Sequence, residues 1–227
     1  MPRRPRTAPG GLACHVINRS SGNIKLFRDA ADYQAFEKVL AEARERCAMR
    51  VCAYILLPTH FHLVLWPSRE GQLSRFMQWL SMTHTQRWHA RHHNAGRGHL
   101  YQSRFKSFLI EHDAHFLSVC RYVERNALRA KLVKHAEDWM WSSLACREQA
   151  LEKANDLLDD WPVERPRRWQ RLVNRPQSQQ ELEAVRLSVR RGRPYGDDNW
   201  TRKTAARLDL ASTLRPVGRP KKPKRGE

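Results

Sequence analysis

Hydrophobic and polar positions follow two different periods along residues 13–130, and this predicts a mixed α and β fold. Pro58-Thr59 separates two of the apolar runs, which are therefore expected to pair as a hairpin. The predicted strands are 13–18, 51–57, 60–66 and 104–110, and the predicted helices are about 32–47, 72–88 and 113–130.

The order of these elements is β-α-β-β-α-β-α, and its first six members match the split βαβ arrangement. We therefore predict an α+β, ferredoxin-like (RRM-like) antiparallel sheet with helices on one face. The open face of such a sheet often meets nucleic acid, although a fold alone does not define a function.

The periodic pattern of apolar residues weakens beyond Trp141. Together with the composition of its two ends, this divides the chain into four predicted segments. They are a basic, disordered N-terminus (1–11), a folded domain (12–146), a linker with some helix (147–185) and a basic, partly disordered tail (186–227). Further helices are predicted at 181–189 and 198–208. Residues 216–227 contain too few apolar side chains to pack and are expected to be disordered.

The charge of the chain favours a polyanionic partner. Lys and Arg number 42 against 23 Asp and Glu, a formal net charge of +19. Residues 186–227 carry 13 basic and 4 acidic side chains, the densest positive charge in the chain, whereas 147–185 carry 7 and 8. A highly charged protein without a nucleic acid partner is the alternative.

The five cysteines form no Cys-x-x-Cys pair and are interpreted as reduced, buried thiols. No apolar run approaches the 18 or so residues of a membrane span, and no signal peptide is evident. A cytoplasmic, nucleoid-associated protein that binds no membrane is expected.

The first candidate metal-binding residues are in His60-Phe61-His62, on the predicted third strand. Alternation places the two imidazoles on one face of the sheet, where they can bind one metal ion together. Because the chain has 11 histidines, such a pair also arises readily by chance, and an ordinary pair of histidines is the alternative.

The helix predicted over 113–130 contributes a phenol and an amide four residues apart. Tyr122 and Asn126 lie off the predicted core face of this helix, on the polar side with Arg125 and Arg129. An ordinary half-buried tyrosine is the alternative for Tyr122. Tyr101, which follows a Gly-rich loop, is a second candidate nucleophile, and we favour Tyr122.

Three blocks of the sequence resemble one family in order and spacing. Residues 54–65 (Tyr-Ile-Leu-Leu-Pro-Thr-His-Phe-His-Leu-Val-Leu), 101–107 and 121–133 are similar to the HUH single-tyrosine transposases, and among these to the REP-associated tyrosine transposases. The resemblance covers about residues 12–146. The chain departs from the family at Ala127, where proline is frequent, and at Thr59, where asparagine is usual.

This resemblance implies an HUH domain that cleaves and rejoins single-stranded DNA. His60 and His62, with Asn126 as a weaker third ligand, would bind Mg²⁺ or Mn²⁺. Tyr122 would attack the phosphodiester and form a 5′-phosphotyrosine intermediate. The implied substrates are hairpins of repetitive extragenic palindromes, and the protein would act as a monomer or homodimer. The alternatives are a non-catalytic binder of structured DNA and an RNA-binding module.

Basic side chains on the predicted β and α elements and in the tail are candidates for DNA binding. The tail also contains two Gly-Arg-Pro tripeptides, which resemble the core of an AT-hook; a solvated basic tail that binds phosphate without sequence preference is the alternative. The candidate DNA-binding residues are Arg104, Lys106, Arg125, Arg129, Arg191, Arg193, Arg219 and Lys221.

Overall fold

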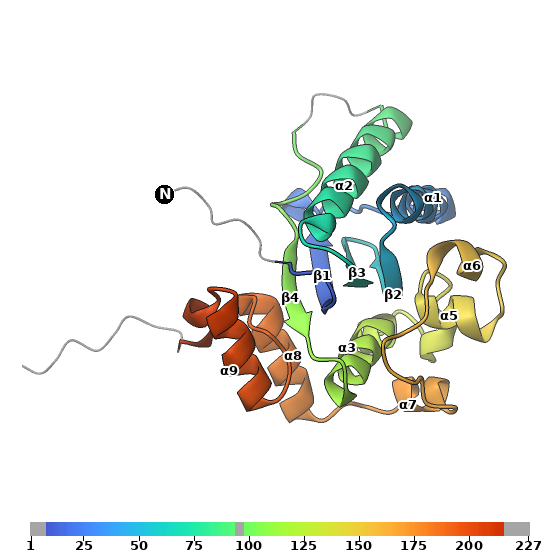
Figure 1. Ribbon diagram of the computed structural model, residues 1–227. Helices are drawn as coiled ribbons and strands as arrows, with labels where there is room; N and C mark the ends of the chain where they lie inside the picture. Colours follow the sequence, from blue (N-terminus) through green and yellow to red (C-terminus); the bar gives the residue numbers. More distant parts are fainter. Residues whose placement is uncertain (1–7, 94–97, 216–227) are drawn as a thin grey trace, which may run out of the picture.

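The computed structural model describes residues 8–93 and 98–215, and its centre is a four-stranded antiparallel sheet (Figure 1). The strands lie in the order β2-β3-β1-β4, the order of a ferredoxin-like fold. Their bounds are β1 Ala13–Arg19, β2 Arg50–Leu57, β3 His60–Trp66 and β4 Lys106–Ile110. The predicted fold class and element order are confirmed.

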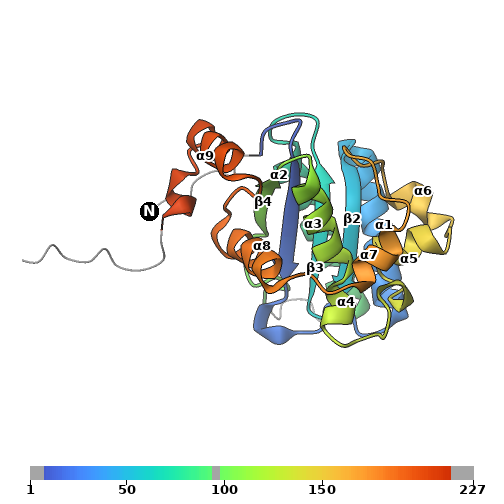
Figure 2. The ribbon, with the colours of Figure 1, turned by 90° about the horizontal axis from the view of Figure 1, so that it is seen from below.

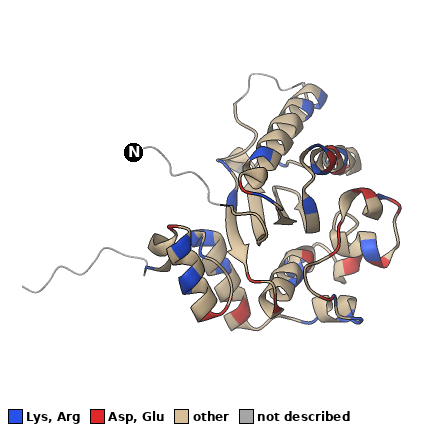
Figure 3. Cartoon of the chain, in the orientation of Figure 1, with Lys and Arg blue, Asp and Glu red and all other residues tan. Residues whose placement is uncertain are grey.

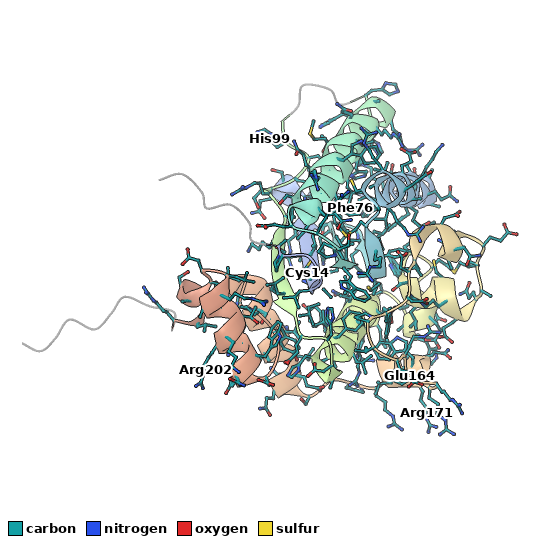
Figure 4. The ribbon with its side chains drawn as sticks, viewed as in Figure 1. Cys14, Phe76, His99, Glu164, Arg171 and Arg202 are labelled. Carbon is teal, nitrogen blue, oxygen red and sulfur yellow. The ribbon has the colours of Figure 1, made fainter. Side chains whose placement is uncertain are left out.

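Helices α1 (Ala30–Cys47) and α2 (Gln72–Arg91) cover one face of the sheet (Figure 1). The Asp29 side chain accepts a hydrogen bond from the Asp32 amide at the start of α1, and this cap explains why the helix begins two residues before the predicted position. Phe76 of α2 packs in the core of this layer, with Cys14 from β1 (Figure 4).

The opposite face of the sheet is also covered. Helix α3 (Ala114–Glu124) crosses it, and α8 (Gln179–Arg191) packs beside α3 and β4 (Figure 2). Phe108, Phe116 and Val119 are buried between this face and α3. Helices therefore lie on both faces, not only on the one face expected, because the part of the chain after residue 113 folds back onto the sheet.

The segments between and after these elements are short and mostly helical. They comprise η1 Ser21–Asn23, α4 Asn126–Arg129, η2 Ala136–Asp138, α5 Ser143–Glu148, α6 Lys153–Leu157, α7 Trp169–Asn174, α9 Asp198–Arg207 and η3 Ala211–Leu214. The helices predicted at 181–189 and 198–208 are confirmed by α8 and α9.

Residues after position 138 form backbone hydrogen bonds with both outer strands of the sheet, β2 and β4. The Leu56 amide on β2 donates to the Trp141 carbonyl at 2.9 Å, and the Tyr195 amide donates to the Leu109 carbonyl on β4 at 2.8 Å. Covered edges leave no free row of backbone groups along β2 or β4 at these points. The division into a domain, linker and tail stays a prediction, but residues 147–215 pack closely against the domain.

The first Gly-Arg-Pro tripeptide belongs to this packed region. Gly192 has a φ of 69° and ends α8 in the left-handed conformation, and Pro194 is buried. An extended AT-hook at 190–194 is therefore wrong, since the glycine serves as a helix cap. The second tripeptide and the predicted disorder of 216–227 lie outside the described residues, as do positions 1–7 of the N-terminus.

Candidate active site

His60 and His62 lie on β3 with their side chains on the α3 side of the sheet. In the antiparallel register His60 pairs with Arg19 and His62 with Ile17 on β1. Phe61, between them, packs on the opposite face against Phe36 of α1. The predicted sharing of one face is thus confirmed, and the two imidazole centroids are 5.2 Å apart.

The side chain of Tyr122, on α3, lies next to this pair of imidazoles, between α3 and the sheet. Its ring centroid is 6.0 Å from that of His62, and the two rings are nearly perpendicular, at 82°. The tyrosine is only 7% exposed, so the prediction that it lies on the polar side of its helix is wrong. The reason is that its ring faces the sheet, where it lies against His15 and His62.

Asn126 follows Tyr122 by four residues, at the start of the single turn α4. Residues spaced in this way lie next to each other on a helical surface, and both are 7% exposed. Within the described residues the Asn126 side chain makes no hydrogen bond, so its amide oxygen is free to serve as a ligand.

Burial keeps both imidazoles of the pair neutral at physiological pH. It lowers the pKa of His60 to about 4, and the charges of Arg19 and Arg129 act in the same direction. The pKa of His62 is also held well below its usual value, first by burial and then by His15 and His60. Neutral imidazoles keep a ring nitrogen lone pair available, which is the form that binds metals.

Arg129 brings a positive charge to the same place. Its guanidinium carbon lies 4.1 Å from the centroid of the Tyr122 ring, a cation–π contact. Burial lowers the pKa of Arg129, although guanidinium stays charged in proteins. A half-buried cation beside a phenol and two imidazoles suits the binding of an anionic group such as phosphate.

Tyr101, the rival nucleophile, lies on the other side of the sheet. Its ring packs against Phe61, and its hydroxyl oxygen is 2.6 Å from Nδ1 of His84 on α2. Burial raises the pKa of Tyr101 well above its usual value. Because the sheet separates it from His60 and His62, Tyr101 does not share their site.

Arg104, just before β4, and Lys106, its first residue, are both exposed and line a cavity of about 260 Å³. Arg19 and Arg190, which were not among the predicted residues, line the same cavity. Arg19 pairs with His60 across β1 and β3, so this basic cavity adjoins the histidine pair.

Other predicted DNA-binding residues are engaged within the protein. Arg125 donates to the carbonyl oxygens of Val173 and Asn174, and Arg191 to those of Ser212 and Thr213. These bonds hold the C-terminal segments in place.

Arg193 lies 3.7 Å from the Asp198 carboxylate in a half-exposed ion pair. Arg219 and Lys221 lie outside the described residues. Lys and Arg positions gather on α8 and α9 (Figure 3).

The site contains one histidine that the sequence pattern did not single out. His15 on β1 is fully buried, and its Nε2 is 2.8 Å from Nδ1 of His62. The available signal was a single histidine within the apolar run 13–18, on the strand that pairs with the strand of the His-x-His pair.

A second cluster of potential ligands, Glu111, Asp113 and His115, lies at the turn from β4 to α3. Its carboxylates are already used for structure: Glu111 accepts from the Asp197 amide, and Asp113 caps α3 through the His115 amide. We assign no metal to this cluster.

Comparison with known proteins identifies the family. Residues 10–126, just over half of the chain, match the family model described as "Transposase IS200 like". No curated protein matches the chain significantly. The chain belongs to the IS200-like transposases, a family of enzymes that cleave and transpose DNA.

Two solved structures resemble the chain at low identity. One is a REP-associated tyrosine transposase bound to a REP hairpin, with 17% identity, a TM-score of 0.49 and coverage of 72% of this chain and 94% of that one. The other, from Deinococcus radiodurans, carries a provisional transposase assignment, with 15% identity, a TM-score of 0.39 and coverage of 54% and 95%. Across the described ranges, none of the helices has the length and apolar character needed to span a bilayer.

Proposed function

We propose that the protein cleaves and rejoins single-stranded hairpin DNA through a covalent bond between Tyr122 and a 5′ phosphate. The observation that carries this proposal is the meeting of Tyr122 with the His60 and His62 imidazoles in one partly enclosed site. DNA cleavage by a tyrosine needs a nucleophilic oxygen, a means of balancing the phosphate charge and a surface for the strand. The chain has candidates for each.

The donor set fits a divalent metal ion. Two neutral imidazoles and one amide oxygen form a mixed nitrogen and oxygen set, in which the amide oxygen, together with water, is the kind of ligand that Mn²⁺ and Mg²⁺ prefer. His60, His62 and Asn126 are the residues that would hold the ion. When bound, it would polarise the scissile phosphate and offset its charge.

In the reaction, the hydroxyl oxygen of Tyr122 forms a bond to phosphorus, and the bond from phosphorus to the 3′ oxygen breaks. The phenolic proton is balanced by the proton gained at the departing 3′-hydroxyl. Arg129, which contacts the Tyr122 ring, is placed to neutralise the phosphate as the bond forms. The new bond is again a phosphodiester, so the reverse step rejoins the strand without ATP.

The basic cavity beside His60 is the proposed path of the strand. Arg19, Arg104, Lys106 and Arg190 line it, and each can contact a phosphate of the backbone. Hairpins of repetitive extragenic palindromes are the substrate class that the resemblance of the sequence implies.

The test uses the full chain, a labelled single-stranded hairpin from the genome of the source organism, and Mn²⁺. The wild type should form a covalent protein–DNA adduct, and Tyr122→Phe should bind the hairpin but form none. Tyr101→Phe is the matched control and should still form the adduct, because Tyr101 faces the other layer. A wild type that binds hairpins tightly without any adduct would instead be a non-catalytic binder.

A further inference from the structure

His15 is a histidine that contacts the proposed ligands without belonging to them. It lies on β1 between β3 and β4, with no exposed surface, and its ring stacks on Phe108 at a centroid distance of 4.8 Å. Its Nε2 is 2.8 Å from Nδ1 of His62, a hydrogen bond between two buried imidazoles. Nothing in the proposed reaction uses this residue directly.

The hydrogen bond restricts which nitrogen of His62 can bind a metal. Nδ1 of His62 is engaged by His15, so Nε2 is the nitrogen that remains. A neutral imidazole carries one hydrogen, and a ligating nitrogen must carry none. The hydrogen of a ligating His62 is therefore on Nδ1 and is donated to Nε2 of His15.

This arrangement also determines which ring nitrogen of His15 carries the hydrogen. If Nε2 of His15 accepts, the ring hydrogen must lie on Nδ1. That atom is buried and has no hydrogen-bond partner in the part of the chain that the structure describes. With the opposite arrangement, in which His15 donates, His62 carries its hydrogen on Nε2 and cannot bind a metal through either nitrogen.

In His60, too, Nδ1 has a hydrogen-bond partner within the protein, but the partner is a different residue. Its Nδ1 is 3.2 Å from the hydroxyl oxygen of Thr59, which leaves Nε2 of His60 free as well. Both histidines of the pair thus use Nδ1 within the protein, as metal-binding histidines commonly do.

We infer that His15 is a positioning residue for the metal site, which orients the His62 ring and, by accepting a hydrogen bond from its Nδ1, presents Nε2 as the ligand. This inference rests on the proposed function. Metal-ligating histidines often donate to a carboxylate instead. A neutral imidazole can also accept the hydrogen bond that orients the ring, and it adds no negative charge next to the phosphate that the site is proposed to bind.

The test measures metal binding rather than cleavage. Mn²⁺ affinity of the full chain is measured by electron paramagnetic resonance for the wild type, His15→Phe and His15→Gln. The phenyl ring keeps the stacking on Phe108 but cannot accept, so Mn²⁺ affinity should fall about 10–100-fold. The glutamine amide oxygen can accept, so His15→Gln should bind nearly as tightly as the wild type.

His84→Phe is the matched control, since His84 is another buried histidine but faces the opposite layer beside Tyr101. It should leave Mn²⁺ affinity unchanged. Thermal unfolding of each variant without metal separates a loss of fold from a loss of binding. Unchanged Mn²⁺ affinity in a folded His15→Phe protein would overturn the inference.

The wild type provides an independent test. Long-range proton–nitrogen NMR correlations of the histidine rings in the presence of Mg²⁺ should show the His62 hydrogen on Nδ1 and the His15 hydrogen on Nδ1. A His62 hydrogen on Nε2 in the metal-bound protein overturns the role of His15. If the wild type binds Mn²⁺ no better than His60→Ala, the metal site itself is absent, and the proposed function fails with it.

Discussion

The guanidinium carbon of Arg129 lies 4.1 Å from the centroid of the Tyr122 ring, and the same side chain donates a 3.4 Å hydrogen bond to the Tyr122 carbonyl. The two residues come from successive helices, α3 and α4. This contact holds the ring of the proposed nucleophile and places a positive charge over its face.

We expect Arg129→Gln to lower the rate of adduct formation by about 10²-fold, because it removes a preorganised charge next to the reacting phosphate. Arg129→Lys should have a smaller effect, since it keeps the charge but not the planar stacking. Single-turnover cleavage at saturating hairpin measures both. Equal rates for Arg129→Gln and the wild type would remove Arg129 from the reacting centre.

The second prediction concerns the metal. His60→Ala and His62→Ala should each abolish Mn²⁺-dependent adduct formation, because each removes one of two neutral imidazoles on the same face of β3. Excess chelator should have the same effect on the wild type. His135→Ala, at an exposed histidine remote from β3 in the sequence, is the control and should cleave normally. Chelator-resistant cleavage would contradict a metal requirement.

The third prediction concerns pH and the attachment of the segment 147–185 to the domain. Asp159 accepts two hydrogen bonds from Arg44 of α1 and one from the Val51 amide of β2. Burial raises the pKa of Asp159, but the bonds from Arg44 and Val51 outweigh burial and hold it below its usual value. Because the folded pKa is depressed, the stabilisation is present above the ordinary value of 3.8 and is lost as pH falls through the folded pKa.

Asp159→Asn should therefore lower the free energy of unfolding at pH 7 by about 1–3 kcal/mol. It should also reduce the loss of stability that the wild type shows on acidification below about pH 4. Urea unfolding at pH 7 and pH 3 measures both effects. Asp160→Asn is the control, since this exposed neighbour takes no part in the bonds to Arg44 and Val51. Identical pH dependence in wild type and Asp159→Asn would contradict the assignment.

The sequence predicted the faces of β3 because a strand has a period of two residues, so His60 and His62 had to share a side. It did not predict the burial of Tyr122. A helical period reveals one core face, whereas the ring of Tyr122 is buried against His15 and His62, on strands that only the long-range packing of α3 on the sheet brings to it. His15 was missed for a related reason: its contact with His62 depends on the pairing of β1 with β3, which alternation within one strand does not define.

The last prediction tests how the positive C-terminal region contributes to DNA binding. Truncation at the predicted boundary after Val185 is unsuitable, because Val185 is fully buried in the middle of α8. A truncation after Arg215 removes five basic residues and one acidic residue while leaving every described element intact. For each phosphate that the protein no longer neutralises, the salt dependence of hairpin affinity should flatten by about 0.7 on single strands.

The basic side chains of α9 are the second source of charge in this region. Arg202, Lys203 and Arg207 are exposed, and Arg202 projects from the outer side of α9 (Figure 4). Substitution of all three by glutamine removes three charges without shortening the chain. The matched control is the same substitution at Arg167, Arg168 and Arg171, which are also exposed but lie in the neutral segment around α7.

We expect the truncation and the α9 variant each to weaken hairpin binding at moderate salt and to flatten the salt slope, and the control to change neither. Adduct formation at saturating DNA and low salt should be unaffected in all three, because the histidine pair and Tyr122 lie in β3 and α3. An unchanged slope in both variants would mean that the C-terminal charge does not contact the strand. Loss of adduct formation at saturating DNA would mean that this region helps to build the reacting site, and the boundary between domain and tail would then have no functional meaning.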